Sequence, residues 1–598
     1  MHVVATAGHV DSGKSTLVRA LTGMEPDRWE EERRRGLTID LGYAWTTLLS
    51  GRDVAFVDVP GHERFLGNML AGIGPAPVVC FVVAADEGWQ AQSSDHRDAV
   101  AALGIEHGVV VLSRADRASG QRVADVLSRT RTELAGTGLR NAPAIAVSAV
   151  DGTGLAELRT ALDGVLAQVP APTTTGRVRL WVDRSFTITG SGTVVTGTLA
   201  AGTLAQGDRL ELLGHSESRP VVVRGLQSRD TSYPSVEPVS RVALNLRDVA
   251  ATDIRRGDAL VTPDAWPTTG VVGIHRTTGV AYTEVPEQIM VHVGTASVPA
   301  RLRPFGADHA RLVLDRPLPL VLGDRLVLRD PGSRSVLGGA RILDADPPEL
   351  RRRGDGAHWA ERLSGMDPAG DILGEVAARG AVQVDHLRKL GLLPGHDAEA
   401  PQGVRVFGDW WVHAPVLEAW QHRLRAAVEA LQEKDPLAPG LSMGAARDLL
   451  RLPDERLLSH VIHGAELEQE SGHIRLPGSR HNLGPIESAI VQLERRLSAA
   501  AFHAPEADEL AALGLGAREL AAAERTGRLL RLRDGVVLLP TAPALAMRTL
   551  AGLAQPFTTS QARQALDTTR RIAVPLLEHL DSRGWTKRID AGHRTVVR

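Results

Sequence analysis

Residues 8–16 read GHVDSGKST, which fits the phosphate-loop pattern G-x-x-x-x-G-K-[ST]. The stretch follows an apolar run at 3–7 and opens a predicted helix, which is the context that the pattern requires. Its glycines let backbone N–H groups wrap phosphates, Lys14 would reach the β- and γ-phosphates, and Ser15 would ligate Mg²⁺. The other predicted nucleotide contacts of this loop are Asp11, Ser12, Gly13 and Thr16.

The residues around this loop alternate between strand and helix signals as far as residue 170. The β-rich runs are 3–8, 53–61, 77–86, 107–116 and 141–149, with helical stretches between them. This alternation predicts a parallel, doubly wound α/β domain over 1–170.

The composition is that of an ordinary globular protein. Of 598 residues, 43% are hydrophobic and 23% are charged, and the net charge is −3. The single cysteine, Cys80, excludes a disulfide framework. The N-terminus lacks the features of a signal peptide, and the longest apolar run, 76–85, is too short to span a bilayer. We therefore expect a cytoplasmic, monomeric protein that does not bind membranes.

The remaining chain changes character twice. After a Pro/Thr-rich linker at 168–176, short alternating runs with Gly-Asp turns predict two β-barrels, at 171–265 and 266–350. Residues 351–598 then repeat helical stretches that each end in an apolar hairpin, marked by glycines 403, 472, 527 and 584. The repeat predicts four tandem winged-helix units, although plain α+β filler is an alternative. The expected units are 366–425, 426–480, 481–543 and 544–598.

Two later motifs complete a nucleotide site. In DVPGH (58–62), Asp58 would hold Mg²⁺ through water, Gly61 would sense the γ-phosphate, and His62 is the predicted catalytic residue that orients the attacking water. In SRAD (113–116), the carboxylate of Asp116 can accept both N–H groups of a guanine edge, a pair that adenine lacks. The backbone of Ser148 and Ala149 would contact the guanine oxygen. GTP and GDP are therefore the expected ligands.

These motifs, in this order, resemble those of the translational GTPases. DRSFTITGSGTVVTGTLAAG (183–202) resembles the barrel that follows the nucleotide domain in elongation factor Tu. RGLTIDLGYAW (35–45) and the winged-helix extension resemble the selenocysteine-specific elongation factors of bacteria, so the resemblance covers the whole chain. Thr38 matches the switch threonine of that family, which closes over Mg²⁺ and the γ-phosphate. The expected Mg²⁺ ligands are therefore Ser15, Thr38 and Asp58. Ser113 and Arg114 depart from the usual N-K-x-D motif, which leaves the tightness of guanine binding open.

The resemblance implies a ribosome-stimulated GTPase that carries selenocysteyl-tRNA to UGA codons marked by an mRNA selenocysteine insertion hairpin. A selenol is a stronger acid than a thiol, so the cargo side chain would be an anion at neutral pH and would call for fixed positive charge. By motif, Asp40, Arg184 and Arg241 match the family's aminoacyl pocket. The alternative is that Asp40 caps a turn and the arginines pair with surface acids.

The end of the chain is basic. Residues 545–598 contain nine Arg or Lys and four Asp or Glu, whereas the whole chain carries −3. A recognition helix followed by a wing over 568–597 would suit the phosphates and an exposed base of the hairpin. A merely solvated basic face remains the alternative. The predicted hairpin contacts are Arg570, Arg571, Lys587, Arg588, His593 and Arg594.

Two other functions fit parts of the pattern. One is an elongation factor for ordinary aminoacyl-tRNA, against which Asp40, Arg184 and Arg241 argue. The other is a regulator that binds RNA or DNA through its winged helices and uses the nucleotide domain only as a switch, which the elongation-factor-like barrels do not suggest.

Overall fold

The computed structural model describes residues 1–26, 38–190, 192–215, 217–350, 354–367, 370–393, 399–478 and 483–597. Residues 35–37 of the RGLTID motif therefore lie outside the described residues. The chain divides into two compact units, 1–375 with 382–401 and 376–381 with 402–598.

The first domain is a six-stranded sheet in the order β2-β3-β1-β4-β5-β6. All neighbouring strands are parallel except β2, which runs antiparallel to β3. The strands are β1 (His2–Ala7), β2 (Gly42–Thr47), β3 (Asp53–Asp58), β4 (Val78–Ala84), β5 (His107–Ser113) and β6 (Ala144–Ala146). Every residue of β4 is buried, which explains why its sequence is an unbroken apolar run.

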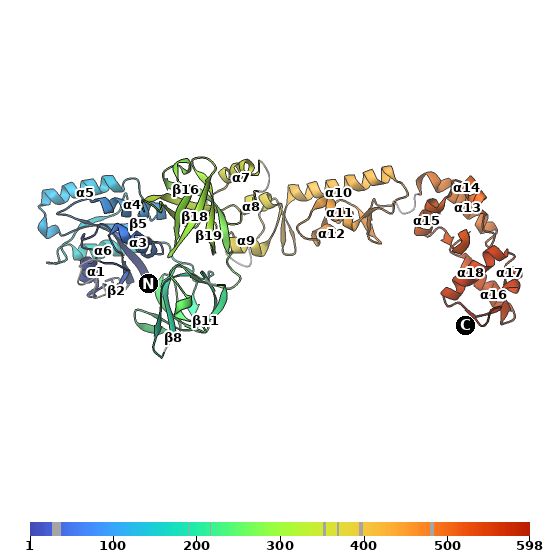
Figure 1. Ribbon diagram of the computed structural model, residues 1–598, viewed down its shortest axis with the longest axis horizontal. Coiled ribbons are helices and arrows are strands. Elements are labelled where there is room, and N and C mark those ends of the chain that lie inside the picture. The colour runs from blue at the N-terminus through green and yellow to red at the C-terminus, as the bar shows by residue number, and fades with distance from the viewer. Residues whose placement is uncertain are drawn as a thin grey trace. The chain divides into compact units, whose positions relative to one another are not determined.

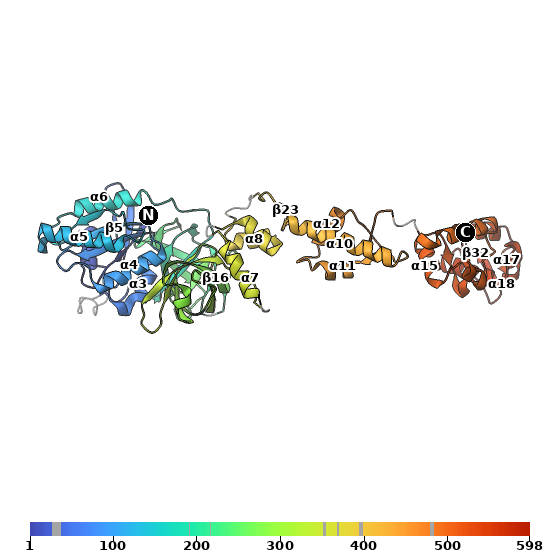
Figure 2. The same cartoon turned by 90° about the horizontal axis from the view of Figure 1, so that it is seen from above.

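Helices cover both faces of this sheet (Figures 1 and 2). The helices are α1 (Lys14–Thr22), α3 (Leu66–Ile73), α4 (Ala91–Leu103), α5 (Gly120–Leu134) and α6 (Leu155–Leu166). Apolar side chains of α3, α4 and α5 share one core, and those of α1 and α6 share another. The doubly wound fold expected from the sequence is confirmed, and its loops at the carboxyl ends of the strands position the nucleotide motifs.

Two barrels follow. In the second domain, six strands close through the β10–β11 pairing, in the order β10-β15-β7-β8-β14-β11, and β12 extends the edge. The strands are β7 (Arg179–Ile188), β8 (Gly192–Leu199), β9 (Leu204–Ala205), β10 (Arg209–Leu213), β11 (Arg219–Ser228), β12 (Thr231–Tyr233), β13 (Ser235–Val236), β14 (Ser240–Arg247) and β15 (Ala259–Val261). The third domain is a closed barrel in the order β16-β19-β18-β17-β20-β21. Its strands are β16 (Thr269–Gly279), β17 (Gln288–Val293), β18 (Ala296–Pro304), β19 (His309–Leu318), β20 (Arg325–Arg329) and β21 (Val336–Asp344).

The C-terminal part consists of short helices and hairpins, which confirms the winged-helix class. Its first elements are α7 (Asp355–Ser364), α8 (Ile372–Arg379), β22 (Ala381–Gln383), α9 (Val384–Leu390), β23 (Val404–Phe407), β24 (Trp410–His413), α10 (Ala414–Lys434), β25 (Leu441–Ser442), α11 (Met443–Leu450), α12 (Leu457–Gly464), β26 (Glu468–Glu470) and β27 (His473–Arg475). The long helix α10 (Figure 1) runs through residue 425, where the sequence had placed a boundary between units. Its side chains Leu417 and Val428 share one core with Trp410 before it and Val461 after it. Trp411 is buried too, so both tryptophans are structural.

The last elements form a second shared core in this part of the chain. They are α13 (Glu487–Ala499), α14 (Ala507–Ala512), α15 (Ala517–Arg525), β28 (Leu530–Arg531), β29 (Val537–Leu538), α16 (Ala542–Ala551), β30 (Phe557–Thr558), α17 (Thr559–Ala565), α18 (Arg570–Ser582), β31 (Thr586–Arg588) and β32 (His593–Val596). The helix α18 begins two residues after the start expected at Thr568, and β31 and β32 form the expected wing. Within the described ranges, none of the helices is long and apolar enough to cross a membrane.

Candidate nucleotide site and cargo pocket

The phosphate loop connects β1 to α1 and bends through two left-handed residues. Asp11 has φ 58° and Gly13 has φ 84°, and Gly13 caps α1. This path directs backbone N–H groups and the positive end of the helix toward one point, as anion-binding loops do. The first glycine is required for packing, because a Cβ on Gly8 would lie 2.1 Å from the carbonyl oxygen of Val82.

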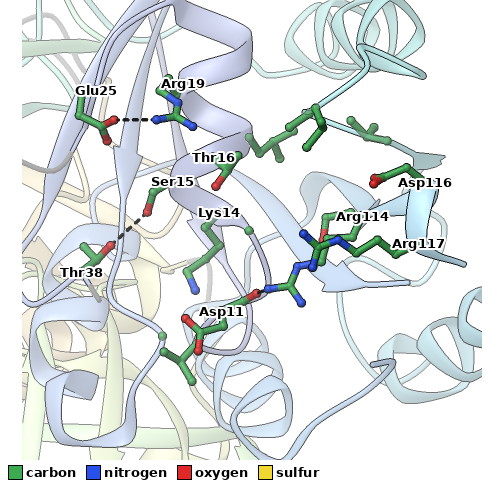
Figure 3. A pocket seen from close by; sticks show the side chains of 18 residues that line it. Asp11, Lys14, Ser15, Thr16, Arg19, Glu25, Thr38, Arg114, Asp116 and Arg117 are labelled. Carbon is green, nitrogen blue, oxygen red and sulfur yellow. Dashed lines mark hydrogen bonds and ion pairs between the residues drawn. The ribbon is translucent and has the colours of Figure 1, made fainter. Parts of the chain in front are cut away.

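A cavity of about 510 Å³ opens over this loop. Figure 3 shows Lys14 and Ser15 at one end of it and Asp116 at the other. Of the predicted nucleotide contacts, those that line the cavity are Asp11, Gly13, Lys14, Ser15, Thr16, Thr38, Gly61, Asp116 and Ala149. The other three, Ser12, Asp58 and Ser148, are almost completely buried.

Oxygen ligands converge at the phosphate end. The Ser15 hydroxyl donates to Asp58 at 2.6 Å and lies 3.1 Å from the Thr38 hydroxyl, and the Thr6 hydroxyl donates to the other Asp58 oxygen at 2.7 Å. The structure thus brings together all three predicted metal ligands. Two hydroxyls and one carboxylate are hard oxygen donors of the kind that Mg²⁺ accepts alongside water and nucleotide phosphates. The set therefore fits the metal.

A buried histidine, His96 in α4, supports the loop and was not identified from the sequence. Its Nδ1 accepts from the backbone N–H of Gly8 at 3.0 Å. Burial, aided by the charge of Lys14, lowers the pKa of His96 to about 3, so the ring is neutral and can act as an acceptor. Gly61 lies against the same loop, since a Cβ there would be 2.5 Å from the Val10 nitrogen. A histidine inside an amphipathic helix gives no signal of such a contact in sequence.

The two residues that depart from the N-K-x-D motif, at the base-binding end of the cavity, contact the phosphate loop. The Ser113 hydroxyl donates to the Ser12 carbonyl at 2.5 Å, and the Arg114 guanidinium donates to the Asp11 carbonyl and to Glu87 at 2.7 Å. Both replacement residues therefore tie the base-binding segment to the phosphate loop. Asp116 follows them in a short 3-10 turn, Ala115–Arg117, with its carboxylate exposed toward the cavity.

His62 is placed differently from the other motif residues. It precedes the 3-10 turn Glu63–Phe65, and its Nδ1 accepts from the backbone N–H of Arg64 at 3.2 Å. Among the described residues, His62 is not one of those that line the cavity. The fold thus places the predicted catalytic group next to Gly61 but outside the nucleotide cavity.

A second cavity, of about 230 Å³, lies between β2 and β3 of the first domain and the barrel of the second domain. Its walls include Arg184, Arg241 and the apolar side chains of Trp45 and Phe186. The ring of Tyr43 lies between the two guanidinium groups, whose central carbons are 5.1 Å (Arg184) and 3.9 Å (Arg241) from its centroid. Cation–π contacts of this kind hold charged groups beside an apolar wall.

Each arginine that lines this cavity has a carboxylate partner, and Arg229 pairs with Asp53 at 2.7 Å, whereas Asp40 is not one of the residues that line it. Asp40 pairs with Arg184 at 3.1 Å and with Arg256 at 2.6 Å, whereas Arg241 forms a two-pronged pair with Asp183. Burial alone would raise the pKa of Asp40, but Arg256 and Arg184 lower it overall, so the carboxylate is ionised. For the guanidinium of Arg241, burial alone would lower the pKa, but the neighbouring Asp183 raises it overall. Tyr43, Asp183 and Arg256 were not identified from the sequence.

The wing of the last unit carries the remaining predicted residues. Arg570, Lys587 and Arg588 are exposed, and His593 is half-buried and pairs with Asp590 at 3.0 Å. Arg594 is only 8% exposed and pairs with Asp581 at 2.9 Å, and Arg571 pairs with Glu506. Arg594 is thus occupied within the fold, whereas the side chain of Arg571 keeps 30% of its surface exposed. The exposed face instead includes Trp585, Ile589 and Val597, which are 40%, 56% and 48% exposed.

Comparison with known proteins agrees with this architecture. The family model described as "Elongation factor Tu GTP binding domain" matches residues 1–168. "Selenocysteine-specific elongation factor, beta-barrel domain" matches 283–349, and "Elongation factor SelB, winged helix" matches 548–595. The fold and the nucleotide site define a translational GTPase of the elongation factor Tu type.

Relatives that match over most of the chain specify the family within this class of GTPases. The chain is 33% identical over 505 residues to the selenocysteine-specific elongation factor of Escherichia coli K12, covering 82% of this chain and 81% of the relative. It is 29% identical to that of Desulfomicrobium baculatum, covering 98% of each. The crystal structure of a bacterial selenocysteine-specific elongation factor has the same fold over 100% of both chains, with a TM-score of 0.74 at 24% identity. The chain belongs to the family of selenocysteine-specific elongation factors.

Replacing Asp116 with Asn tests the base-binding end. An amide offers a donor beside its acceptor, so it can pair with the 2-carbonyl of xanthine but loses one of two charge-assisted bonds to guanine. We expect affinity for GTP to fall on the order of a hundredfold and affinity for XTP to rise, measured by nucleotide titration. Asp125→Asn, on the exposed face of α5, is the matched control. Equal losses for both nucleotides would contradict the assignment.

Proposed function

We propose that this GTPase, in its GTP-bound state, delivers selenocysteyl-tRNA to ribosomes at UGA codons marked by an mRNA hairpin. The observation that carries the proposal is the small cavity in which Arg184 and Arg241 flank Tyr43. Its volume, about 230 Å³, suits one aminoacyl side chain. The names of the relatives, which are selenocysteine-specific factors, support the same assignment.

The charge balance of the cavity favours an anionic side chain. Of the residues that line it, three carry guanidinium groups (Arg184, Arg229 and Arg241) and one carries a carboxylate (Asp230), so the wall itself is positive. Apolar walls weaken solvent screening, so this charge acts more strongly on a selenolate than it would in water. A serine side chain carries no charge to gain from it.

In the proposed cycle, Ser15, Thr38 and Asp58 would hold Mg²⁺, which would supply positive charge to the phosphates of GTP. Thr38 would close on the γ-phosphate and release it after hydrolysis, which changes the segment that also carries Asp40. Because His62 lies outside the cavity, it would reach the attacking water only after a rearrangement. The ribosome is the partner expected to induce that rearrangement.

Substitution of the arginines tests cargo selection directly. We expect the GTP-bound protein to prefer selenocysteyl-tRNA over seryl-tRNA built on the same tRNA body. Arg184→Ala or Arg241→Ala should reduce this preference by about tenfold or more, because each removes a positive charge from the cavity. Binding would be measured at equilibrium with both aminoacyl forms.

Two controls separate the outcomes of that test. Arg219→Ala, on another strand of the same barrel, pairs with Asp253 and should leave the preference unchanged. Arg184→Lys should retain part of it. If the wild type binds both aminoacyl forms equally, selection does not depend on the cavity. If it binds neither, the carrier function is wrong, and the nucleotide-switch regulator becomes the better hypothesis.

The last winged helix is the proposed hairpin-binding site. Lys587 lies in β31 opposite Thr595 of β32. Trp585 and Ile589 adjoin this strand two residues before and after Lys587, the spacing at which side chains share one face of a strand. An exposed indole beside cations provides a stacking surface for an unpaired base together with contacts for phosphates. Arg570 at the start of α18 and Arg588 on the wing add positive charge.

Trp585→Ala should weaken hairpin binding by roughly 5- to 150-fold, the range expected for one lost base stack. Trp585→Phe should retain most of the affinity, since it keeps an aromatic face. Lys587→Ala should instead reduce the salt dependence of binding by about one phosphate contact. The measurement is an equilibrium titration of the full chain with the RNA hairpin at several salt concentrations. Unchanged affinity of both variants would exclude this wing as the binding face.

A further inference from the structure

Arg256 occupies a junction between the two domains that the proposed cycle must connect. It lies in the barrel of the second domain, directly before Gly257 and close to the start of β15. Its Nη2 donates to Asp40 at 2.6 Å, its Nη1 donates to the side chain of Asn68 at 2.7 Å, and its Nε donates to the backbone carbonyl of Asp183 at 2.9 Å. The side chain is 28% exposed. One planar guanidinium thus fixes three separate segments, a use for which its rigid donor geometry is suited.

Two of these segments adjoin the nucleotide cavity. Asp40 lies two residues after Thr38, whose hydroxyl is 3.1 Å from that of Ser15 in the phosphate loop. Asn68 belongs to α3, which follows the DVPGH motif, and its amide donates to the Ile39 carbonyl at 3.0 Å. The segment with Thr38 and the segment after Gly61 are therefore joined to each other and to Arg256.

The third segment leads into the cargo cavity. The carboxylate of Asp183 binds Arg241, while its backbone carbonyl accepts from Arg256. Asp40, in turn, is shared between Arg256 at 2.6 Å and Arg184 at 3.1 Å. Arg256 binds Oδ1 of this carboxylate and Arg184 binds Oδ2, so Arg184 shares its counter-charge with a second cation. A continuous series of hydrogen bonds and ion pairs thus connects Ser15 with both cavity arginines.

We propose that Arg256 is the positioning residue that couples nucleotide state to cargo affinity. It binds Asp40, so that Asp40 does not fully neutralise the charge of Arg184. It also links the segment after Gly61 to Asp183. This role rests on the proposed carrier function. When the Thr38 segment moves with the nucleotide, Asp40 moves with it, and the positive charge that Arg184 presents to the cargo changes. Without Arg256, Asp40 would neutralise Arg184 in either nucleotide state.

The test is a measurement of coupling in both directions. Selenocysteyl-tRNA affinity would be measured with a non-hydrolysable GTP analogue and with GDP, and the affinity of the analogue would be measured with and without the tRNA. We expect Arg256→Ala to reduce the ratio of cargo affinities between the two nucleotide states by about tenfold or more. By thermodynamic linkage, the tightening of the analogue by cargo must fall by the same factor. Affinity for GDP without cargo should stay as in the wild type.

Matched variants distinguish coupling from structural damage. Arg255→Ala, an exposed neighbour on the same loop, should behave as the wild type. Asn68→Ala removes one of the three partners and should reduce the ratio partially, which provides a second reading if Arg256→Ala does not fold. In a double-mutant cycle, Arg256→Ala and Asp40→Asn should be strongly non-additive.

The outcomes are distinguishable. A wild type whose cargo affinity does not depend on the nucleotide contradicts the carrier function itself. A wild type that shows the dependence, together with Arg256→Ala or Asn68→Ala variants that keep the full ratio, contradicts the role of Arg256 alone.

Discussion

The carboxylate of Asp40 joins the nucleotide-binding domain to the barrel of the second domain by accepting from two arginines, Arg184 and Arg256. It lies on the short segment between the switch threonine and β2, so it belongs to the part of the chain that a γ-phosphate would reorganise. A partly buried ion pair of this kind loses solvation, and the attraction between its charges offsets that cost only if the partners are well placed. The organisation of the cargo cavity therefore depends on where this one carboxylate lies.

Local motifs allowed much of the fold and of the nucleotide site to be predicted. GHVDSGKST specifies its own backbone path through its glycines, and the apolar run of β4 is buried throughout, so strand–loop–helix order followed from the sequence. Ser15, Thr38 and Asp58 were predicted as one set, and the structure brings their oxygens together. Asp40 and Arg184 were predicted to belong to one pocket, and they form an ion pair.

The residues that sequence reasoning missed act through long-range contacts. His96 and Arg256 sit in stretches with no motif, and Asp183 opens a stretch that indicated only the barrel; the partners of all three are far along the chain. Conversely, the basic composition of the last unit could not separate Arg588, which is exposed, from Arg594, which is buried against Asp581. Hairpin glycines located the winged helices, but they could not show that α10 belongs to a core shared across the expected boundary.

In the altered base motif, Ser113 and Arg114 connect the base-binding segment with the phosphate loop. Ser113 and Arg114 bind carbonyls of the phosphate loop, so the segment that carries Asp116 stays attached to the loop that carries Lys14. The two ends of the nucleotide cavity are thereby held at a fixed separation.

The proposed selection of selenocysteyl-tRNA requires that the cavity recognises an anion. The most direct test is the pH dependence of the ratio between selenocysteyl-tRNA and seryl-tRNA affinities, measured with the GTP-bound protein while its fold is monitored. As the pH falls through the pKa of the selenol, the cargo becomes neutral, and we predict that the ratio falls toward one while seryl-tRNA binding stays constant. A ratio that does not change across that range would show that the cavity selects its cargo by size or by the tRNA body, and not by charge.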